Sequence, residues 1–222
     1  MVFDLIPVRP NPREDYQKRV EKLCNLLKDE DGSTYRVDVF TLLTISGTTF
    51  SKKPFIKFRK HPQAEWFLSV YHSDVRALEI MDELDKIYGA DPGEIDHLRG
   101  AVGEVFSFFI CRKVYPKAGM EVKIRIGTWT SGLIDAAGCS QKRGHCLQSK
   151  ASLRYWNSIF SQKKDLDRIE KLTAGKAQGA FITYENREVF YRRLRNAGFN
   201  PSEYKVLDRW DLSALEKRLV AT

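Results

Sequence analysis

Apolar residues recur at helical spacing in several parts of the chain. In one of them Tyr16, Val20, Leu23 and Leu27 fall three or four positions apart among charged residues, the pattern of a helix with one buried face. This spacing predicts helices over residues 13–30, 62–90 (in two pieces), 94–114, 153–175, 186–197 and 212–219, the last with Asp211 as its N-cap.

Short apolar or alternating runs rich in β-branched and aromatic residues predict strands. These strands cover residues 34–50 (with a turn at 46–47), 121–127, 132–138, 145–151, 179–184 and 205–209. A short polar segment separates 132–138 from 145–151, which predicts a hairpin. From residue 94 onward the order is α-β-β-β-α-β-α-β-α, which predicts an α/β (α+β) fold, with a mixed β-sheet flanked by helices.

Residues 89–93, Gly-Ala-Asp-Pro-Gly, form the best candidate for a domain boundary, because glycine and proline interrupt both helices and strands. We therefore expect an N-terminal α/β extension over residues 1–93 and a core domain over residues 94–222.

The composition indicates a soluble protein with an anionic partner. The chain has 222 residues, 30% of them charged, and a formal net charge of +8. A basic surface favours nucleic acid as that partner. The N-terminus lacks the pattern of a secretion signal, and no apolar run approaches the roughly 18 residues of a membrane span. None of the four cysteines forms a C-x-x-C pair, so a cytoplasmic protein with reduced thiols is expected.

The predicted hairpin carries the residues of greatest chemical interest. Asp135 lies within a small apolar strand, where a carboxylate is costly unless it is paired or binds a metal. Gln148 and Lys150 are two positions apart on the partner strand, so their side chains leave the same face. Cross-strand pairing can bring Asp135 beside them. A carboxylate, an amide oxygen and an ammonium group would then converge at one strand end.

Glu104 is the fourth candidate. Helical spacing places it on one face with Gly100, Phe108 and Cys111, where a carboxylate is unusual. Gly100 and Gly103 lack side chains, which allows another backbone to approach this helix closely.

These residues resemble the PD-(D/E)xK nuclease superfamily, which has the restriction-endonuclease-like fold. The resemblance rests on RGAVGE (99–104), SGLIDAAG (131–138) and CLQSK (146–150), in the order helix, strand, strand. The glutamine in the last motif and the tail VLDRWDLSALEKRL (206–219) are similar to Mrr-like restriction endonucleases and Holliday-junction-resolvase relatives. The resemblance covers about residues 94–220.

The resemblance implies a role for each residue. Asp135 would be the central metal ligand, and Gln148 would coordinate through its amide oxygen. Glu104 would bind the metal directly or through water, and Lys150 would orient or activate the attacking water. The implied cofactor is Mg²⁺, with Mn²⁺ as a substitute. Oxygen ligands suit both ions, which assist phosphodiester hydrolysis.

The implied protein is a DNA endonuclease, with a restriction or other defence role as the best fit. A Holliday-junction resolvase or repair nuclease, and a catalytically inactive DNA-binding module, are the alternatives. Residues 1–93 would recognise DNA or support dimerisation, and a homodimer is expected because cutting both strands usually needs two active sites. Without the family pattern, each residue has an ordinary interpretation: a salt-bridged Asp135, a solvated Glu104, a polar strand residue Gln148 and an exposed Lys150.

Further basic residues are candidates for phosphate binding. Lys142 and Arg143 lie at the predicted hairpin tip, near the proposed site. Lys57, Arg59 and Lys60 belong to a basic run at 51–61 that is interleaved with Phe55 and Phe58. A solvated strand face with its phenylalanines in the core explains this run equally well.

Two other patterns have simpler interpretations. Cys139, His145 and Cys146 lack the second ligand pair of a structural zinc site, so we expect no zinc there. His97 is expected at the surface or as a cap near the start of its helix.

Overall fold

The computed structural model describes residues 2–9, 11, 13–46, 49, 57–150 and 156–221. The first part of the basic run (51–56) lies outside the described residues. So do residues 151–155, which include the last residue of the predicted hairpin and the start of the helix predicted over 153–175.

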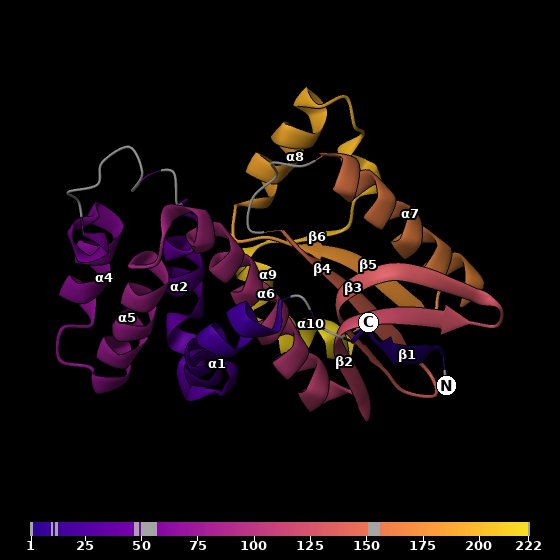
Figure 1. Ribbon diagram of the computed structural model, residues 1–222, viewed down its shortest axis with the longest axis horizontal. Helices are drawn as coiled ribbons and strands as arrows, with labels where there is room; N and C mark the ends of the chain where they lie inside the picture. Colours follow the sequence, from indigo (N-terminus) through magenta and orange to yellow (C-terminus); the bar gives the residue numbers. More distant parts are fainter. Residues whose placement is uncertain are drawn as a thin grey trace.

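A mixed sheet forms the centre of the molecule, as the sequence predicts (Figure 1). Its six strands lie side by side in chain order. Neighbours from the first strand to the fourth are antiparallel, and neighbours from the fourth to the sixth are parallel. They are β1 (Asp4–Pro7), β2 (Lys117–Ile126), β3 (Trp129–Cys139), β4 (Gly144–Ser149), β5 (Ala177–Ile182) and β6 (Val206–Leu207). The predicted hairpin is β3 and β4, in which Ala136 pairs with Leu147.

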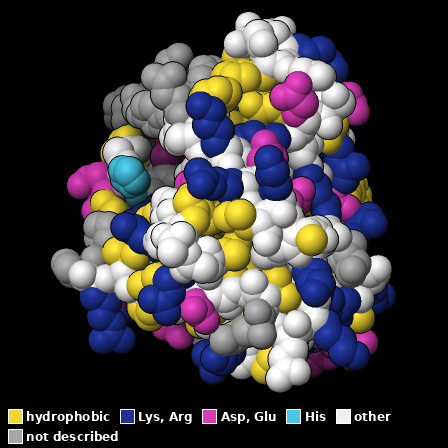
Figure 2. Space-filling model, turned by 90° about the vertical axis from the view of Figure 1, so that its right-hand side faces the viewer, with side chains coloured by type: hydrophobic (Ala, Val, Ile, Leu, Met, Phe, Trp, Pro, Cys, Tyr) yellow, Lys and Arg dark blue, Asp and Glu magenta, His cyan; other side chains and the backbone are white. Residues whose placement is uncertain are grey.

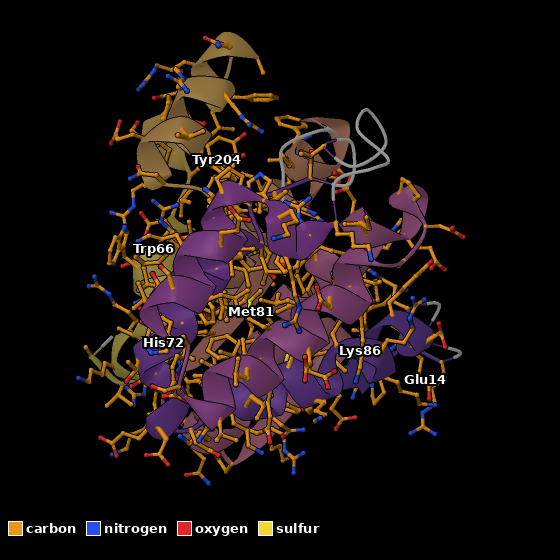
Figure 3. The ribbon with its side chains drawn as sticks, turned by 90° about the vertical axis from the view of Figure 1, so that its left-hand side faces the viewer. Glu14, Trp66, His72, Met81, Lys86 and Tyr204 are labelled. Carbon is orange, nitrogen blue, oxygen red and sulfur yellow. The ribbon has the colours of Figure 1, made fainter. Side chains whose placement is uncertain are left out.

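The long helix α6 (Pro92–Val114) packs on one face of the sheet and separates it from an outer layer of helices (Figure 1). That layer contains α1 (Glu14–Lys28), α2 (Arg36–Leu42), α4 (Pro62–Val70) and α5 (Val75–Tyr88), with the 3-10 turns η1 (Asp31–Tyr35) and η2 (Phe58–Lys60). Figure 3 shows this layer face on, with the buried Met81 among its helices. The C-terminal helices α9 (Arg209–Ser213) and α10 (Leu215–Ala221) contribute Leu212, Leu215 and Leu219 to the same core.

The opposite face of the sheet carries α7 (Trp156–Leu172) and α8 (Arg187–Asn196), which η3 (Pro201–Glu203) follows. Ile159, Leu166 and Phe190 form a second core there with residues of β2 to β6. No helix in the part of the chain that the structure describes combines the length and the apolarity that crossing a bilayer requires.

The prediction of strands over residues 34–50 is wrong for the residues that the structure describes there, 34–46 and 49. Residues 31–42 form η1 and α2, and Tyr35, Val39, Phe40 and Leu43 are buried at helical spacing. Arg36 donates hydrogen bonds to the carbonyl groups of three residues that end α1, and to Ser213 O at 2.9 Å. Tertiary packing here overrides the β-propensity of threonine, valine and phenylalanine.

Two smaller expectations also differ from the structure. β1 was not predicted, because a four-residue strand at the sheet edge has too little pattern of its own. Asp208, not Asp211, is the N-cap of α9: its carboxylate accepts hydrogen bonds from the amides of Trp210 and Asp211. Asp211 takes the third helical position of a capping box.

Residues on both sides of the expected boundary at 93/94 contribute to the same structural units. β1 pairs with β2, so the N-terminal residues complete the sheet. α1 packs along α6, and Leu23 and Val102 share one core. Residues 1–93 therefore reach the surroundings of the hairpin directly.

The alternation of side chains reverses in the middle of β2. Met120 and its partner Ala136 face the core on the α6 side, whereas Val122 and its partner Ile134 face the core on the α7 side. In a regular strand these even-numbered residues would share one face. Glu121, between them, has a φ of 52°, in the left-handed region that non-glycine residues rarely adopt. At Glu121, and at Asp135 opposite it, the side chains of the strand therefore change from one face of the sheet to the other.

Candidate active site

Three buried carboxylates converge where the sheet reverses its faces. Glu104 comes from α6, Glu121 from β2 and Asp135 from β3, and one oxygen atom of each lies within 4.8 Å of the others. Each of the three residues is at most 6% exposed. Such a concentration of negative charge away from water is costly unless cations or protons compensate it.

Asp135 is held by the adjacent strand. Its Oδ2 accepts a hydrogen bond from the amide of Ser149, at 2.7 Å, at the end of β4. Burial raises the pKa of Asp135, while the positive charge of Lys150 and the Ser149 hydrogen bond oppose that shift. Among the described residues no hydrogen bond is made to its other oxygen, Oδ1, which can therefore bind a ligand.

Glu104 is oriented by the N-terminal part of the chain. The guanidinium of Arg13 forms an ion pair with Oε1, and Gln17 Nε2 donates a hydrogen bond to Oε2 at 3.1 Å. Burial raises the pKa of Glu104 to about 8, the charge of Asp135 adds to this, and Arg13 opposes it. Gly103 gives room to a side chain rather than to another backbone, because a Cβ atom there would collide with the hydroxyl group of Ser149.

Glu121 was not recognised in the sequence. Val122, Ile124 and Ile126 alternate, so regular alternation would turn Glu121 to the opposite, solvated face. The left-handed backbone at Glu121 buries it beside Asp135 instead. Both of its carboxylate oxygens are buried without a hydrogen-bond partner. Burial and the charge of Asp135 raise the pKa of Glu121 to about 7.

Gln148 continues the hairpin register opposite Asp135 and is fully buried. Its amide Nε2 donates a hydrogen bond to Leu133 O, at 2.7 Å, and this fixes the orientation of the amide. Its Oε1 is buried without a hydrogen-bond partner. The amide oxygen therefore has an unused acceptor, which metal coordination can use.

Lys150 follows β4, and its amide donates a hydrogen bond to Ile182 O at 2.9 Å. Burial lowers the pKa of Lys150, and the charges of Asp135, Glu104 and Glu121 all act to raise it again. The ammonium group thus lies within the field of the whole carboxylate cluster. The alternative interpretation, an exposed strand lysine, does not fit, because Lys150 is half-buried.

The N-terminal residues Arg13 and Gln17 are a part of the site that the sequence did not indicate. Gln17 is 4% exposed and also accepts a hydrogen bond from Asn11 Nδ2 at 2.7 Å. One signal was present: Gln17 stands three positions before Val20 and seven before Cys24, so it is a polar residue on the apolar face of its helix.

The residues fit a hard divalent cation. Mg²⁺ and Mn²⁺ prefer oxygen ligands, and carboxylates are the most common of these. Asp135, Glu104 and Glu121 supply converging carboxylate oxygens, and Gln148 has an amide oxygen without a partner. A bound cation would satisfy the unpartnered oxygens of Glu121 and reduce the mutual repulsion of the carboxylates.

Stabilisation of the fold by Mg²⁺ is expected to increase from about pH 5.5 to about pH 8.5. The pKa values of about 8 for Glu104 and about 7 for Glu121 exceed the ordinary value of 4.5, so these groups are protonated in the metal-free fold at low pH. The metal-free protein should therefore lose stability as the pH rises, because the ionised form is disfavoured in the fold. Thermal melting with MgCl₂ or EDTA at several pH values measures both trends; a Mg²⁺ effect that is equal at all pH values would contradict this prediction.

The structure places the tip of the hairpin away from the carboxylates. Ser140, where the tip begins, is five residues beyond Asp135, or about 16 Å along an extended strand. Arg143 donates a hydrogen bond to Val220 O at 2.5 Å and lies over the ring of Tyr115. Lys142 is exposed. The proximity of this tip to the site, which was the reason for choosing Lys142 and Arg143, is therefore absent.

The basic residues 57–60 lie next to α4 and α5 rather than on a strand. Arg59 pairs with Asp82 at 2.5 Å and also with Asp85. Lys60 lies 3.7 Å from Glu65, and Lys57 is exposed. The charge of Arg59 is used within the protein, so of this group Lys57 and Lys60 are the more accessible to phosphate.

The remaining expectations concern histidines and cysteines. His97 is exposed and stacks on Tyr16, with 5.2 Å between the ring centroids. His145 Nδ1 forms a hydrogen bond with the hydroxyl group of Tyr115. Among the described residues, the acidic cluster is the one group of histidine, cysteine and carboxylate ligands whose geometry could hold a metal ion.

Comparison with known proteins leaves the family open. No protein-family model and no curated protein matches the chain. Protein VC1899 from Vibrio cholerae is similar over 95% of this chain and 56% of its own, with 14% identity and a TM-score of 0.44. Can2 from Sulfobacillus thermosulfidooxidans, in complex with cyclic tetra-adenylate, is similar over 99% and 58%, with 15% identity and a TM-score of 0.45. The chain spans little more than half of each, and function is inferred from the site itself.

Proposed function

We propose that this protein is a metal-dependent nuclease that hydrolyses phosphodiester bonds in DNA, with Mg²⁺ as its cofactor. The observation that carries the proposal is the buried cluster of Glu104, Glu121 and Asp135, whose oxygens converge within 4.8 Å. Burial of carboxylates without enough hydrogen-bond or ion-pair partners does little to stabilise a fold. Carboxyl groups whose pKa is shifted in this way are typical of functional sites.

The second supporting observation is the lysine beside the carboxylates. A bound Mg²⁺ would neutralise the phosphate and lower the pKa of the attacking water. Lys150 is placed to orient that water or the phosphate, because its ammonium group interacts with all three carboxylates. Arg13 pairs with Glu104 and adds a further positive charge, and its side chain is 31% exposed.

The proposal also accounts for one departure of this chain from the family pattern. The PD-(D/E)xK pattern has an acidic residue two positions before the lysine, and this chain has Gln148 there. Glu121, from the neighbouring strand, brings a further carboxylate to the cluster. We propose that Asp135, Glu104 and Glu121 are the anionic ligands and that Gln148 adds its amide oxygen.

The proposal of DNA as the substrate rests on the net charge of +8 and on the resemblance. Figure 2 shows lysine and arginine side chains spread widely over one face of the molecule. A long polyanion would be attracted to such a surface. A restriction or other defence role remains the proposed biological setting.

The test is incubation of the protein with plasmid, branched and single-stranded DNA, in Mg²⁺, Mn²⁺ or EDTA. Cleavage is expected with either metal and none with EDTA. A Glu121→Gln variant should need more metal to reach half-maximal rate, because an amide replaces an anionic ligand. The matched control is Glu203→Gln, on the exposed turn η3. Cleavage that persists in EDTA, or no cleavage of any of these DNAs with either metal, would refute the proposal.

A further inference from the structure

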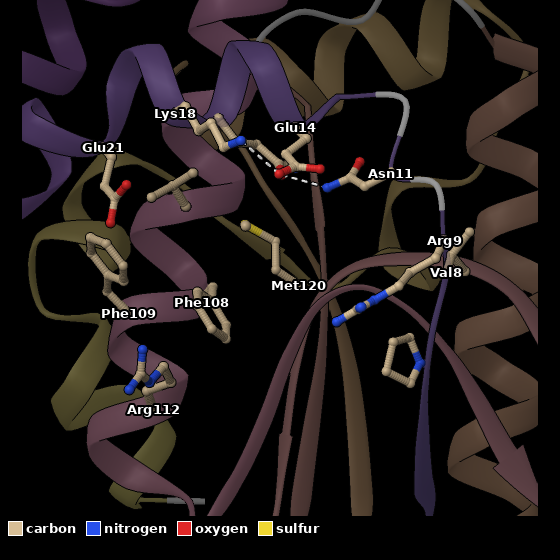
Figure 4. A pocket seen from close by; sticks show the side chains of 13 residues that line it. Val8, Arg9, Asn11, Glu14, Lys18, Glu21, Phe108, Phe109, Arg112 and Met120 are labelled. Carbon is tan, nitrogen blue, oxygen red and sulfur yellow. Dashed lines mark hydrogen bonds and ion pairs between the residues drawn. The ribbon is translucent and has the colours of Figure 1, made fainter.

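A pocket of about 570 Å³ lies beside the carboxylate cluster, between the N-terminal segment, α1 and α6 (Figure 4). This volume falls within the roughly 300–1,000 Å³ typical of small-molecule sites. Figure 4 shows Met120 and Phe108 on one side of the space and Arg9 extending towards it from the N-terminal segment.

The pocket and the carboxylate cluster share their walls. Gln17, which lines the pocket, donates its hydrogen bond to Glu104. Val105 and Met120 also line it, and they are the neighbours in sequence of Glu104 and Glu121. The pocket therefore lies next to the cluster, and Gln17 contacts both.

The lining suits a nucleotide base. Phe108, Phe109 and Met120 offer apolar and aromatic surface, and both phenylalanines are half-buried. Base stacking on aromatic side chains is the main sequence-independent contact of proteins with single-stranded nucleic acid. Glu21 adds a hydrogen-bond acceptor for the amino groups of a base.

The same pocket has cations suited to phosphates. Arg112 lies over the ring of Phe108, 5.6 Å from its centroid, and is exposed. Arg9 is exposed as well. Lys18 is less available, because Glu14 pairs with it at 2.8 Å. Aromatic surface with arginines at its rim is the combination that binds an unpaired nucleotide.

We propose that this pocket binds one unpaired nucleotide of the substrate, next to the phosphate that is cut. Phe108 and Met120 contact the base, and Arg9 and Arg112 contact the flanking phosphates. A base inside a duplex can enter only after it is unstacked and unpaired, whereas a base in a single strand does not bear that cost. The preferred substrate therefore has a single-stranded segment at the cleavage point. This inference rests on the proposed nuclease function and adds the substrate structure to it.

The test measures binding separately from cleavage. Fluorescence anisotropy with a labelled single-stranded oligonucleotide and with its duplex is carried out in EDTA, so that no strand is cut. The protein is expected to bind the single strand more tightly than the duplex. Phe108→Ala should weaken single-strand binding about tenfold and leave duplex binding nearly unchanged. The control Phe160→Ala removes an exposed phenylalanine of α7 on the other face of the sheet and should change neither.

A second variant guards against a simple loss of structure. Phe108→Trp keeps an aromatic surface and should retain single-strand binding, whereas Arg112→Gln should weaken it and reduce its dependence on salt. Equal binding of single strand and duplex, with no effect of Phe108→Ala, would overturn the inference even if the protein cuts DNA. Tight single-strand binding that depends on Phe108 would support the pocket even if no cleavage occurred.

Discussion

Replacement of Asp135 by asparagine is expected to abolish cleavage while leaving the fold intact. The loss should exceed the roughly 10–100-fold that the outer partners of metal ligands contribute, because Asp135 lies at the centre of the carboxylate cluster. Asparagine has nearly the same shape, and its oxygen can still accept the hydrogen bond from the Ser149 amide. DNA cleavage in Mg²⁺ measures this effect.

The same variant should separate metal binding from folding. Removal of a buried charge relieves repulsion with Glu104 and Glu121, since the negative charge of Asp135 raises the pKa of both. The metal-free variant should therefore melt no earlier than the parent protein, whereas the rise in melting temperature with Mg²⁺ should vanish. Asp15→Asn, at a position whose side chain is 82% exposed, is the matched control. If Asp135→Asn cleaved DNA at the rate of the parent protein, Asp135 would not belong to the active site and the proposal would fail.

Replacement of Lys150 by methionine is expected to lower the cleavage rate by about 10²–10⁴-fold, the range of general acid–base catalysis. Methionine has a similar length and suits a half-buried position, but it cannot orient water or neutralise the phosphate. The rate should be measured with saturating Mg²⁺, so that a change in metal affinity does not contribute.

Unlike Asp135→Asn, Lys150→Met should keep the rise in melting temperature with Mg²⁺ at about pH 8.5. The loss of its positive charge removes repulsion of the metal, although it also lets the pKa of Asp135 rise further. Lys171→Met, at an exposed position near the end of α7, is the matched control. If Lys150→Met lost both the cleavage activity and the stabilisation by Mg²⁺, the lysine would support the structure of the cluster rather than the reaction.

The hairpin and the helix beside it were predictable because their signals are local. Residues 132–138 and 145–151 alternate within a few positions of a short polar turn, and their register follows from that turn. Asp135, Gln148 and Lys150 were therefore identified together. Glu104 was identified because a carboxylate on the apolar face of a helix is unusual.

Local patterns failed where distant residues decide the conformation. Residues 31–42 contain β-branched and aromatic residues, but they form helices that pack between α1 and α9. Arg36 stabilises that arrangement through the carbonyl group of Ser213, a residue 177 positions away. No window of neighbouring residues contains this information.

The carboxylate cluster shows the same division between local sequence signals and contacts of distant residues. The sequence by itself determined the order of the elements after residue 94, the hairpin register and the positions of Asp135 and Lys150, since periodicity and turn chemistry act over a few residues. The tertiary structure alone decided that Glu121 joins them, because one left-handed residue reverses the alternation. It also brought Arg13 and Gln17 to Glu104, across 87 positions for Gln17, because α1 packs along α6.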